Sequence, residues 1–503
     1  MNSDVIQGFA QSALPTSLLA TAIGSLLGIV VGMIPGMTIS TGIIILLPLT
    51  FVMDPASSIA LLLGLYVGGM MGGSFSAILL NIPGTPSASA TGLDGYPMAA
   101  RGEAGRALGI AIVASFLGGM TSFACLFFIA PALADFALNF RTEDLFSLLL
   151  FGLTVICTFS SRSLVKGLIA AVLGLMIATI GPDPVMTTAR FTFGSIDMIS
   201  GVHFLTALIG LFAIPQIVEN MRDTGMHAQT VRIAAGFRNV LPRMADLKKM
   251  LVPASLGSVT GVMLGVLPGA GGPIAAFLSY DYARRISPDR EEFGKGAVAG
   301  VAAPEAANNA VTGGALIPMM TLGIPGDPVT AILIGALIIH GLAPGPLLFL
   351  QNGDFGYGMI FSFLWANIFN LIIAFASLRI LVRLLAIPKA FLMPTVALLC
   401  VVGSYALRNN IFDVYVMFAF GLLGIGMRWL DMPVVPLLLA LVLGNQLEEQ
   451  LRVALIGSKG DISIFFTSSY SPLFLSMAAL SVIWSLVSDY RRRKRTPQSA
   501  GAE

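Results

Sequence analysis

Long apolar stretches recur along the whole chain, and no other feature of the sequence limits its fold so strictly. Four of these stretches are Ala104–Leu133, Glu143–Phe159, Leu164–Ile180 and Ile199–Ile217. A helix that crosses a bilayer needs about 20 predominantly apolar residues, with a range of about 17–25. Charged residues make up only 11% of the 503 residues, whereas soluble domains contain about 25%. The sequence therefore predicts an all-α polytopic membrane protein.

The basic residues are unevenly placed, and their placement predicts which way each end of the chain faces. The first hundred residues contain no Lys or Arg, whereas cytoplasmic loops usually carry an excess of both. Basic residues gather in the segment 221–249, and the run Arg491–Arg495 follows the last apolar stretch. We therefore expect an outward-facing N-terminus, a cytoplasmic connecting loop at 221–249 and a cytoplasmic C-terminal tail.

Two Pro-Gly motifs each occur twice, in the same order, and this indicates an internal repeat. The stretch Gly28–Gly36 aligns without a gap with Gly261–Gly269. Further along each half, Ile82–Pro86 aligns with Ile324–Pro328. Each half therefore contains two helix breaks, and repeats of this kind point to a common structural unit.

Breaks within membrane helices are costly, so four of them at corresponding positions require an explanation. Proline removes an N–H group and clashes with the preceding turn, at about 3 kcal/mol in a helix interior. Unpaired backbone groups add a further cost in hydrocarbon, unless they lie in protein or line a polar cavity. Discontinuous helices at matching positions of two inverted halves are typical of transporter binding sites. Freed N–H groups suit an anion, and freed carbonyls suit a cation such as Na⁺.

The other charged residues can be assigned consistently to the two sides of the membrane only if the segments around Pro35 and Pro268 enter and leave on the same side, as re-entrant hairpins do. This predicts about 11 crossings plus two hairpins, with an odd number of crossings in the first half. The fold expected is then two inverted-topology repeats with re-entrant hairpins and discontinuous helices. The predicted parts are a first membrane repeat at 1–220, the basic cytoplasmic loop at 221–249, a second membrane repeat at 250–463, an extra C-terminal helix at 464–488 and a basic tail at 489–503.

Residues that form or flank the breaks are the candidate substrate ligands. They are Pro35, Gly36, Thr38, Ser40, Asn81, Pro83, Gly84, Thr85 and Ser87 in the first half, and Pro268, Gly269, Gly271, Pro325, Gly326 and Thr330 in the second. Small hydroxyl residues also pack membrane helices closely, so close packing is the more common explanation for any single Ser or Thr among them.

Two carboxylates within apolar segments are the main candidates for ion coupling. A charged side chain at the membrane centre costs at least about 2.5–3.5 kcal/mol, which marks it as a functional candidate. Asp327 lies inside a break, where its counterpart in the first half is Thr85, and it is a candidate Na⁺ ligand. Glu305 begins a run that also contains Asn308 and Asn309, and these three residues complete the predicted coupling set. Glu305 could instead cap the start of a helix.

Other functional classes have little support in the sequence. The net charge of +2 gives no indication of a nucleic-acid partner. The glycines of Gly269–Gly272 lack the Lys-Ser/Thr ending of a phosphate-binding loop. We find no nucleophile–base pair, so an intramembrane enzyme is a remote alternative, and we expect no cofactor besides a coupling ion. The sequence does not specify an oligomeric state.

Longer motifs surround the breaks. They are Gly32–Gly36, Gly42–Pro48, Asn81–Ser87 and Asp94–Gly102 in the first half, and Gly265–Gly272, Ala303–Asn309 and Thr321–Pro328 in the second. Together they resemble the motifs of the large membrane subunit, the TctA type, of the tripartite tricarboxylate transporters. The resemblance extends over residues 15–490.

The resemblance implies partners, substrates and an energy source. The partners would be a small membrane subunit (TctB type) and a periplasmic solute-binding protein (TctC type) that delivers the substrate. The substrates would be di- and tricarboxylates such as citrate, or related organic anions, and uptake would be driven by an ion gradient, usually thought to be Na⁺. The location would be the bacterial inner membrane, with the N-terminus in the periplasm. A stand-alone carboxylate carrier or exchanger is the alternative that the residues leave open.

Overall fold

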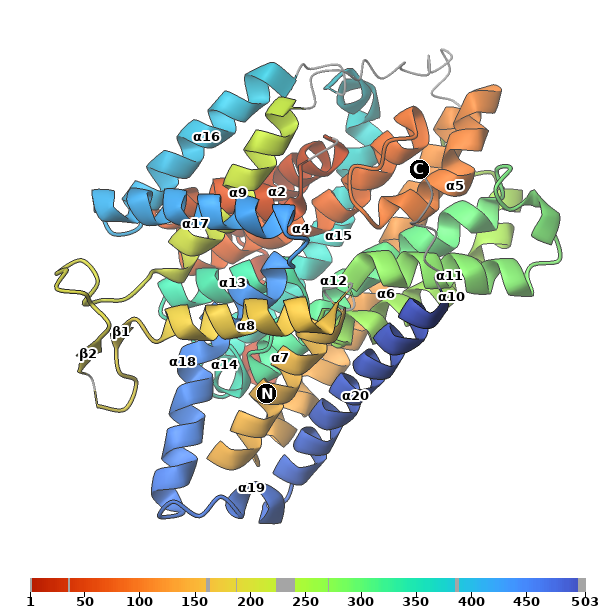
Figure 1. Cartoon of the computed structure of the whole chain (residues 1–503). Helices are drawn as coiled ribbons and strands as arrows, with labels where there is room; N and C mark the ends of the chain where they lie inside the picture. Colours follow the sequence, from red (N-terminus) through yellow and green to blue (C-terminus); the bar gives the residue numbers. More distant parts are fainter. Residues whose placement is uncertain are drawn as a thin grey trace, which may run out of the picture. The chain divides into compact units, whose positions relative to one another are not determined.

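Helices make up nearly all of the structure, a computed structural model that describes residues 2–34, 37–159, 163–186, 188–222, 240–269, 271–384 and 389–495 (Figure 1). Within these ranges, seven helices are long and apolar enough to cross a bilayer, and five shorter helices are also apolar. These helices agree with the predicted class of all-α polytopic membrane protein. The number of crossings and the inverted orientation of the halves stay predictions.

The chain divides into two compact units, and each takes segments from both halves of the sequence. The first unit consists of Met1–Ala137 and Phe212–Ile411, and the second of Leu138–Leu211 and Phe412–Glu503. The predicted repeat boundaries follow the order of the sequence instead, and they stay predictions. Because all four Pro-Gly motifs belong to the first unit, the candidate site can be described within that unit alone.

The first unit contains the helices that flank the breaks, together with several others. They are α1 (Asn2–Ser12), α2 (Pro15–Met33), α3 (Ile39–Thr50), α4 (Pro55–Leu80), α5 (Ala88–Met98), the π-helical turn η1 (Ala99–Glu103), α6 (Ala104–Ala137), α10 (Met244–Val266), α11 (Gly271–Ile286), the 3₁₀ turn η3 (Arg290–Glu292), α12 (Val298–Leu322), α13 (Pro328–Ile339), α14 (Pro346–Gln351), α15 (Gly353–Leu384) and α16 (Lys389–Ala406). Every described break thus separates two helices, as the sequence predicted. Helix α10 begins within the segment that was predicted to be the connecting loop.

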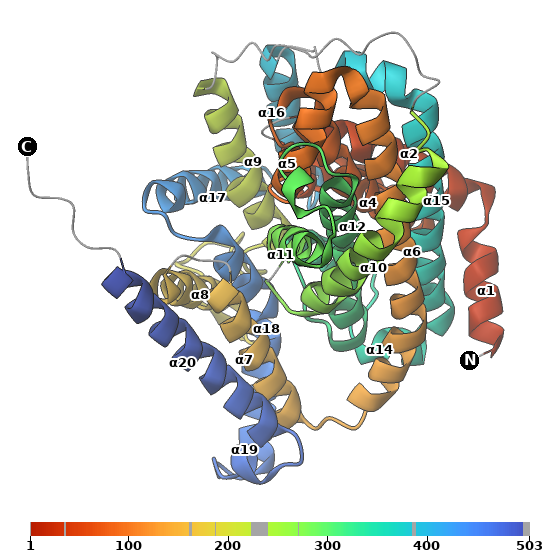
Figure 2. The same cartoon turned by 90° about the vertical axis from the view of Figure 1, so that its right-hand side faces the viewer.

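Glycines bring two pairs of helices into backbone contact, and the two pairs are built alike. On α2, a Cβ atom at Gly28 would lie 2.4 Å from the carbonyl oxygen of Leu65 on α4. On α10, a Cβ atom at Gly261 would lie 2.3 Å from the carbonyl oxygen of Ala307 on α12. The motif alignments pair Gly28 with Gly261 and, extended along the helices, Leu65 with Ala307. Equivalent residues therefore make equivalent contacts, which supports the internal repeat; α10 runs alongside α12 in Figure 2.

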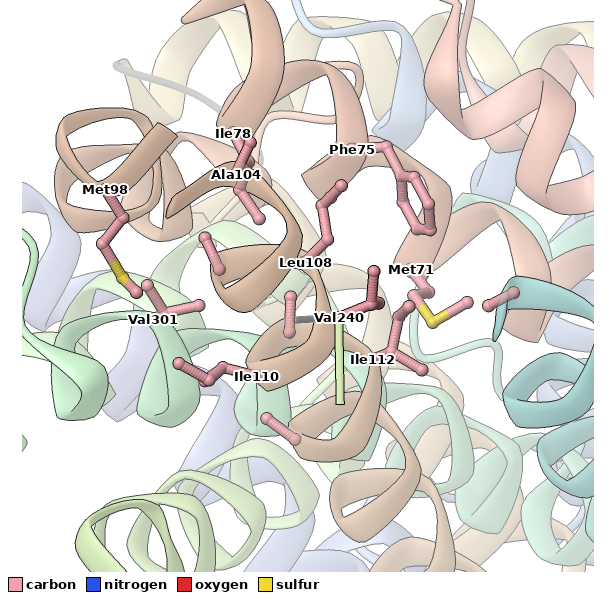
Figure 3. Close-up of a cluster of buried hydrophobic side chains, with 14 of the residues drawn as sticks. Met71, Phe75, Ile78, Met98, Ala104, Leu108, Ile110, Ile112, Val240 and Val301 are labelled. Atoms are coloured by element: carbon pink, nitrogen blue, oxygen red, sulfur yellow. The ribbon is translucent and has the colours of Figure 1, made fainter. Parts of the chain in front are cut away.

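A buried core forms in the first unit where α4, α5, α6 and α12 meet (Figure 3). Phe75 of α4, Leu108 of α6 and Val301 of α12 are fully buried there. Met250 of α10 and Leu378 of α15 belong to the same cluster. Because lipid is as apolar as these side chains, close packing rather than water exclusion holds such helices together.

The second unit consists of helices and a short β-hairpin. Its elements are α7 (Thr142–Phe159), α8 (Leu164–Ala178), the antiparallel strands β1 (Gly181–Pro182) and β2 (Ala189–Arg190), the first part of α9 (Phe204–Arg222), α17 (Ile411–Trp429), α18 (Val434–Gly457), α19 (Ile464–Thr467) and α20 (Ser471–Arg495). The predicted C-terminal helix corresponds to α19 and α20, and α20 continues through the basic run Arg491–Arg495.

Ion pairs hold the hairpin of the second unit to α18. Asp183 accepts a hydrogen bond from the backbone N–H of Met186 at 2.7 Å and pairs with Arg452 at 2.5 Å. Arg190 pairs with Glu448 at 2.7 Å. The Met186 N–H and the Arg452 guanidinium together hold the pKa of Asp183 well below its usual range.

Candidate functional site

Each Pro-Gly break is followed directly by the first turn of a new helix. Thr38 precedes α3, Ser87 precedes α5, Asp327 precedes α13, and α11 begins at Gly271. The Thr38 hydroxyl oxygen accepts the N–H of Thr41 at 3.1 Å, as an N-cap residue does. The first N–H groups of a helix have no partner within it, so these helix starts supply donors next to the breaks.

Within each half, the second break lies against the helix that leads into the first. In the second half, the Gly269 N–H donates to the carbonyl of Gly326 at 2.8 Å. A Cβ atom on Gly326 would lie 2.9 Å from the carbonyl oxygen of Gly265, and one on Gly84 would lie 2.0 Å from that of Gly32. The two halves therefore share this close approach, which leaves no room for a larger residue than glycine.

Asp327 is fixed at the start of α13 by donors from both halves. Its carboxylate accepts the backbone N–H of Thr330 at 2.8 Å, and the Asp327 N–H donates to the Thr330 hydroxyl at 2.9 Å. These two bonds form a capping box. The Tyr66 hydroxyl on α4 donates to the other carboxylate oxygen. Asp327 thus caps a helix and connects the first half to the second, besides any role in binding an ion.

A second group of polar residues gathers at the start of α11. The hydroxyls of Thr85 and Ser87 lie 3.2 Å apart and form a hydrogen bond. Asn308 on α12 donates through Nδ2 to the carbonyl of Met70 at 2.9 Å. A Cβ atom on Gly272 would lie 3.1 Å from Asn308 Oδ1 and 3.3 Å from the Ser87 Cβ. Thr85 and Ser87, which were predicted to bind the substrate, therefore lie near Asn308, which was predicted to bind the ion.

Glu305 lies at the centre of a fully buried polar cluster between α5, α6 and α12. Thr91 and Ser115 each donate a hydroxyl to its carboxylate at 2.9 Å. Asn309 Nδ2 donates to Ser115 Oγ at 2.9 Å and lies 3.3 Å from the Glu305 carboxylate. Within the described part of the chain, no Lys, Arg or His forms an ion pair with Glu305. Since α12 begins at Val298, the alternative that Glu305 caps a helix start is wrong.

Several predicted ligands of the first half lie apart from these clusters or outside the described residues. Pro35 and Gly36 fall outside the described ranges. Among the residues that are described, no hydrogen bond joins Thr38 or Ser40 to the breaks of the second half. Asn81 ends α4 in the left-handed conformation, with φ of 55°, which asparagine adopts more readily than most residues.

Comparison with known proteins identifies the family. Residues 18–439 match the tripartite tricarboxylate transporter TctA family. The chain belongs to this family. It is therefore a transporter component, and the resemblance drawn from its motifs is confirmed.

Two relatives of this TctA-family chain come from Agrobacterium vitis. An uncharacterized 52.8 kDa protein in the TAR-I ttuC′ 3′ region is 36% identical over 492 residues, which cover 98% of this chain and 97% of the relative. An uncharacterized protein in the TAR-II ttuC′ 3′ region is 38% identical over 234 residues, which cover 46% of this chain and 97% of that relative. No solved structure matches the chain.

The site contains residues that the sequence analysis did not select. Tyr66 contacts Asp327 and Ser115 contacts Glu305, yet neither flanks a break in the sequence. The repeat alignment could have identified Tyr66. Extended back from the second breaks along α4 and α12, the alignment pairs Tyr66 with Asn308, which was among the predicted coupling residues. For Ser115 on α6, the repeat alignment gives no corresponding signal.

Asp94, the first residue of the motif Asp94–Gly102, is another buried carboxylate. Its contacts are structural. It accepts three backbone N–H groups, from Gly294 at 2.8 Å, Gly296 at 2.7 Å and Ala297 at 2.8 Å. Its second oxygen accepts the Tyr280 hydroxyl at 2.8 Å. Asp94 thereby fixes the segment between α11 and α12 to α5, which stabilises the start of the helix that carries Glu305.

Proposed function

We propose that this TctA-family chain forms the transport pathway of a secondary importer of di- or tricarboxylates or related organic anions. The import is driven by an inward gradient of Na⁺, and the substrate arrives from a periplasmic binding protein. The observation that carries the proposal is the buried Glu305 cluster beside the helix starts of the Pro-Gly breaks. This arrangement offers a cation and an anion separate but neighbouring positions within one unit.

The helix starts suit a carboxylate although the four breaks contain no Lys or Arg. Among the described residues, no acceptor takes the N–H of Gly271 or of Gly272. Thr85 and Ser87 bring hydroxyl donors to the same place. Helix N-termini and neutral donors hold anions in many proteins, and discontinuous helices of transporters do so at membrane depth. The start of α11 and the break that carries Thr85 and Ser87 therefore supply donors without a fixed positive charge.

The coupling ion belongs at Glu305. A buried carboxylate without a cation is strongly disfavoured, and Na⁺ would supply the missing charge. The Thr91 and Ser115 hydroxyls can turn their lone pairs toward a cation, and Asn309 Oδ1 is buried without a partner in the described structure. Asp327 is the other candidate ligand for the ion. Because its carboxylate already accepts the hydrogen bonds that fix α13, we consider it the weaker candidate.

Family membership supports the proposed partners, and the placement of the basic residues supports the proposed orientation. The small membrane subunit of the TctB type would complete the membrane complex, and the TctC-type protein would deliver the substrate outside. The chain would lie in the bacterial inner membrane with its N-terminus in the periplasm and its C-terminus in the cytoplasm. Cysteine labelling at positions within 221–249 tests the orientation, because this loop should react only from the cytoplasmic side.

Uptake into proteoliposomes tests the function. The full chain, its small membrane subunit and the cognate binding protein would be reconstituted, and uptake of labelled citrate and related acids would be followed. We expect uptake only with an inward Na⁺ gradient and only with the binding protein present. Uptake by the membrane subunits alone, unaffected by added binding protein, would instead establish a stand-alone carrier.

A further inference from the structure

The loop between the hairpin of the second unit and α9 exposes large apolar side chains. Phe193 and Ile196 are 82% and 83% exposed, and Phe191 is also exposed. The segment 191–203 contains one carboxylate, Asp197, and no Lys or Arg. Exposed apolar side chains that gather on one segment mark an interaction surface more often than scattered ones do.

The packing of α8 on α18 shows where this loop lies relative to the apolar part of the second unit. A Cβ atom on Gly174 of α8 would meet the carbonyl oxygen of Leu437 on α18, and one on Gly444 of α18 would lie 2.6 Å from the Cβ of Ala178 on α8. The two helices therefore run in the same direction. The sequence of α18 is apolar up to Gly444 and mostly polar in 445–452, so α8 ends at the level where α18 becomes polar.

The length of α8 places the chain beyond it close to the hydrocarbon. Its 15 residues make a helix about 22 Å long, whereas the hydrocarbon core of a bilayer is about 30 Å thick. The hairpin of β1 and β2 follows the end of α8 directly (Figure 1). A Cβ atom on Gly181 would lie 2.5 Å from the Cα of Gly201, so the whole excursion leaves and returns at this level.

The backbone of the loop suits the headgroup region rather than the hydrocarbon. Two of its N–H groups form turns, from Ser195 to the Thr192 carbonyl at 2.9 Å and from Ile199 to the Ile196 carbonyl at 3.1 Å. Irregular backbone of this kind is excluded from lipid-exposed positions in the hydrocarbon. The headgroup region accepts both apolar side chains and backbone groups that need polar partners.

The charges beside the loop favour lipid over a soluble protein as its partner. Interfaces between proteins place a polar rim around an apolar centre. The charged side chains nearest in sequence, Asp183 and Arg190, are instead paired with Arg452 and Glu448 of α18. These ion pairs fix the hairpin to the polar part of α18, and the exposed side chains that follow the hairpin are mainly apolar.

We propose that Phe191, Phe193 and Ile196 insert into the headgroup region of the lipid bilayer. The ion pairs of the hairpin with α18 hold the loop at that depth. The loop therefore anchors the second unit at the membrane surface, and this role does not depend on which solute is transported.

Spin labels at the loop test the inference. Phe193→Cys and Ile196→Cys would be made in the full chain with its three native cysteines replaced, labelled, and reconstituted with the small membrane subunit into phospholipid vesicles. Collision rates would be measured with O₂, which concentrates in lipid, and with a water-soluble nickel chelate. Lys459→Cys, an exposed position in the turn after α18, is the control. We expect the ratio of O₂ to nickel collisions to be severalfold higher at 193 and 196 than at 459.

The outcomes distinguish lipid from the other possible surroundings of the loop. A ratio at 193 and 196 equal to that at 459 would place the loop in water and overturn the inference. Low collision rates with both reagents would show that protein covers the loop, and would overturn it equally. Neither result bears on the proposed transport function.

A second variant tests the part played by the ion pairs. Arg190→Gln removes the pairing with Glu448, and we expect the ratio at a label on 193 to fall toward that of the control. Lys249→Gln, which breaks an exposed ion pair with Asp289 in the first unit, should leave the ratio unchanged. An unchanged ratio in Arg190→Gln would show that the ion pairs do not set the depth of the loop.

Discussion

The hydroxyl of Tyr66 donates a hydrogen bond to the carboxylate of Asp327, and this bond connects a helix of the first half to a break of the second. Asp327 also caps α13 through Thr330. The carboxylate that the sequence marked as the most obvious candidate for an ion therefore has a structural role of its own. Glu305, in contrast, caps no helix, and no ion pair joins it to another described residue.

Replacing Tyr66 by Phe should destabilise the protein without removing any apolar contact. The Asp327 carboxylate would lose a donor in a buried position, which costs about 1–3 kcal/mol. Thermal unfolding in detergent measures this loss. If the bond exists, a double-mutant cycle with Asp327→Asn will be strongly non-additive; additive losses would show that the two side chains act independently.

Substituting equivalent glycines should damage both halves alike. Gly28→Ala and Gly261→Ala each place a Cβ atom within 2.5 Å of a backbone carbonyl oxygen, and we expect each to cost about 1–3 kcal/mol by overpacking. Gly426→Ala on α17 is the control, because a Cβ atom there meets nothing within 4 Å. The control should be neutral or slightly stabilising. A large loss in only one of the two equivalent variants would contradict the shared packing.

Replacing Glu305 by Gln should strongly impair Na⁺-driven uptake while the chain still inserts and folds. We expect Na⁺-driven uptake to fall at least about tenfold, which corresponds to about 1.4 kcal/mol, because the amide cannot balance a cation. The control is Glu291→Gln, an exposed glutamate on η3. Protein content and melting temperature of the same preparations separate a transport defect from a folding defect.

The ion pairs of the hairpin should make stability fall in acid. The pKa of Asp183 is lowered by the Met186 N–H and Arg452, so its carboxylate stabilises the folded state at every pH above about 4, its ordinary value. This stabilisation is lost as the pH falls toward the lowered pKa. Asp183→Asn should therefore reduce the melting temperature at pH 7, and the difference from the unmodified protein should shrink below about pH 4. A difference that is constant with pH would assign the loss to packing.

Much of the architecture could be predicted from the sequence, because membrane spans and repeated breaks are local patterns. Proline alone does not predict a helix break, however, because Pro304 and Pro318 lie inside the continuous helix α12. The breaks occur where glycine follows proline, as at Pro83–Gly84 and Pro325–Gly326. A membrane helix tolerates single prolines when neighbouring groups satisfy the freed backbone, so the glycine is the informative residue.

The composition of the candidate site could be predicted only in part. Glu305 and Asp327 stand out because a carboxylate is rare in an apolar segment. Their partners Ser115 and Tyr66 lie on other helices, far away in the sequence, and contact them only through tertiary packing. Small hydroxyl and aromatic residues are common in membrane helices, so nothing local distinguishes a ligand from a packing residue.

The most direct test of the account is the simultaneous uptake of ²²Na⁺ and a labelled carboxylate by the same proteoliposomes, with the binding protein present. The account predicts that the two enter together in a fixed ratio and that Glu305→Gln abolishes both movements, whereas Glu291→Gln leaves both unchanged. Carboxylate accumulation without Na⁺ entry, or an unchanged ratio and rate in Glu305→Gln, would contradict it.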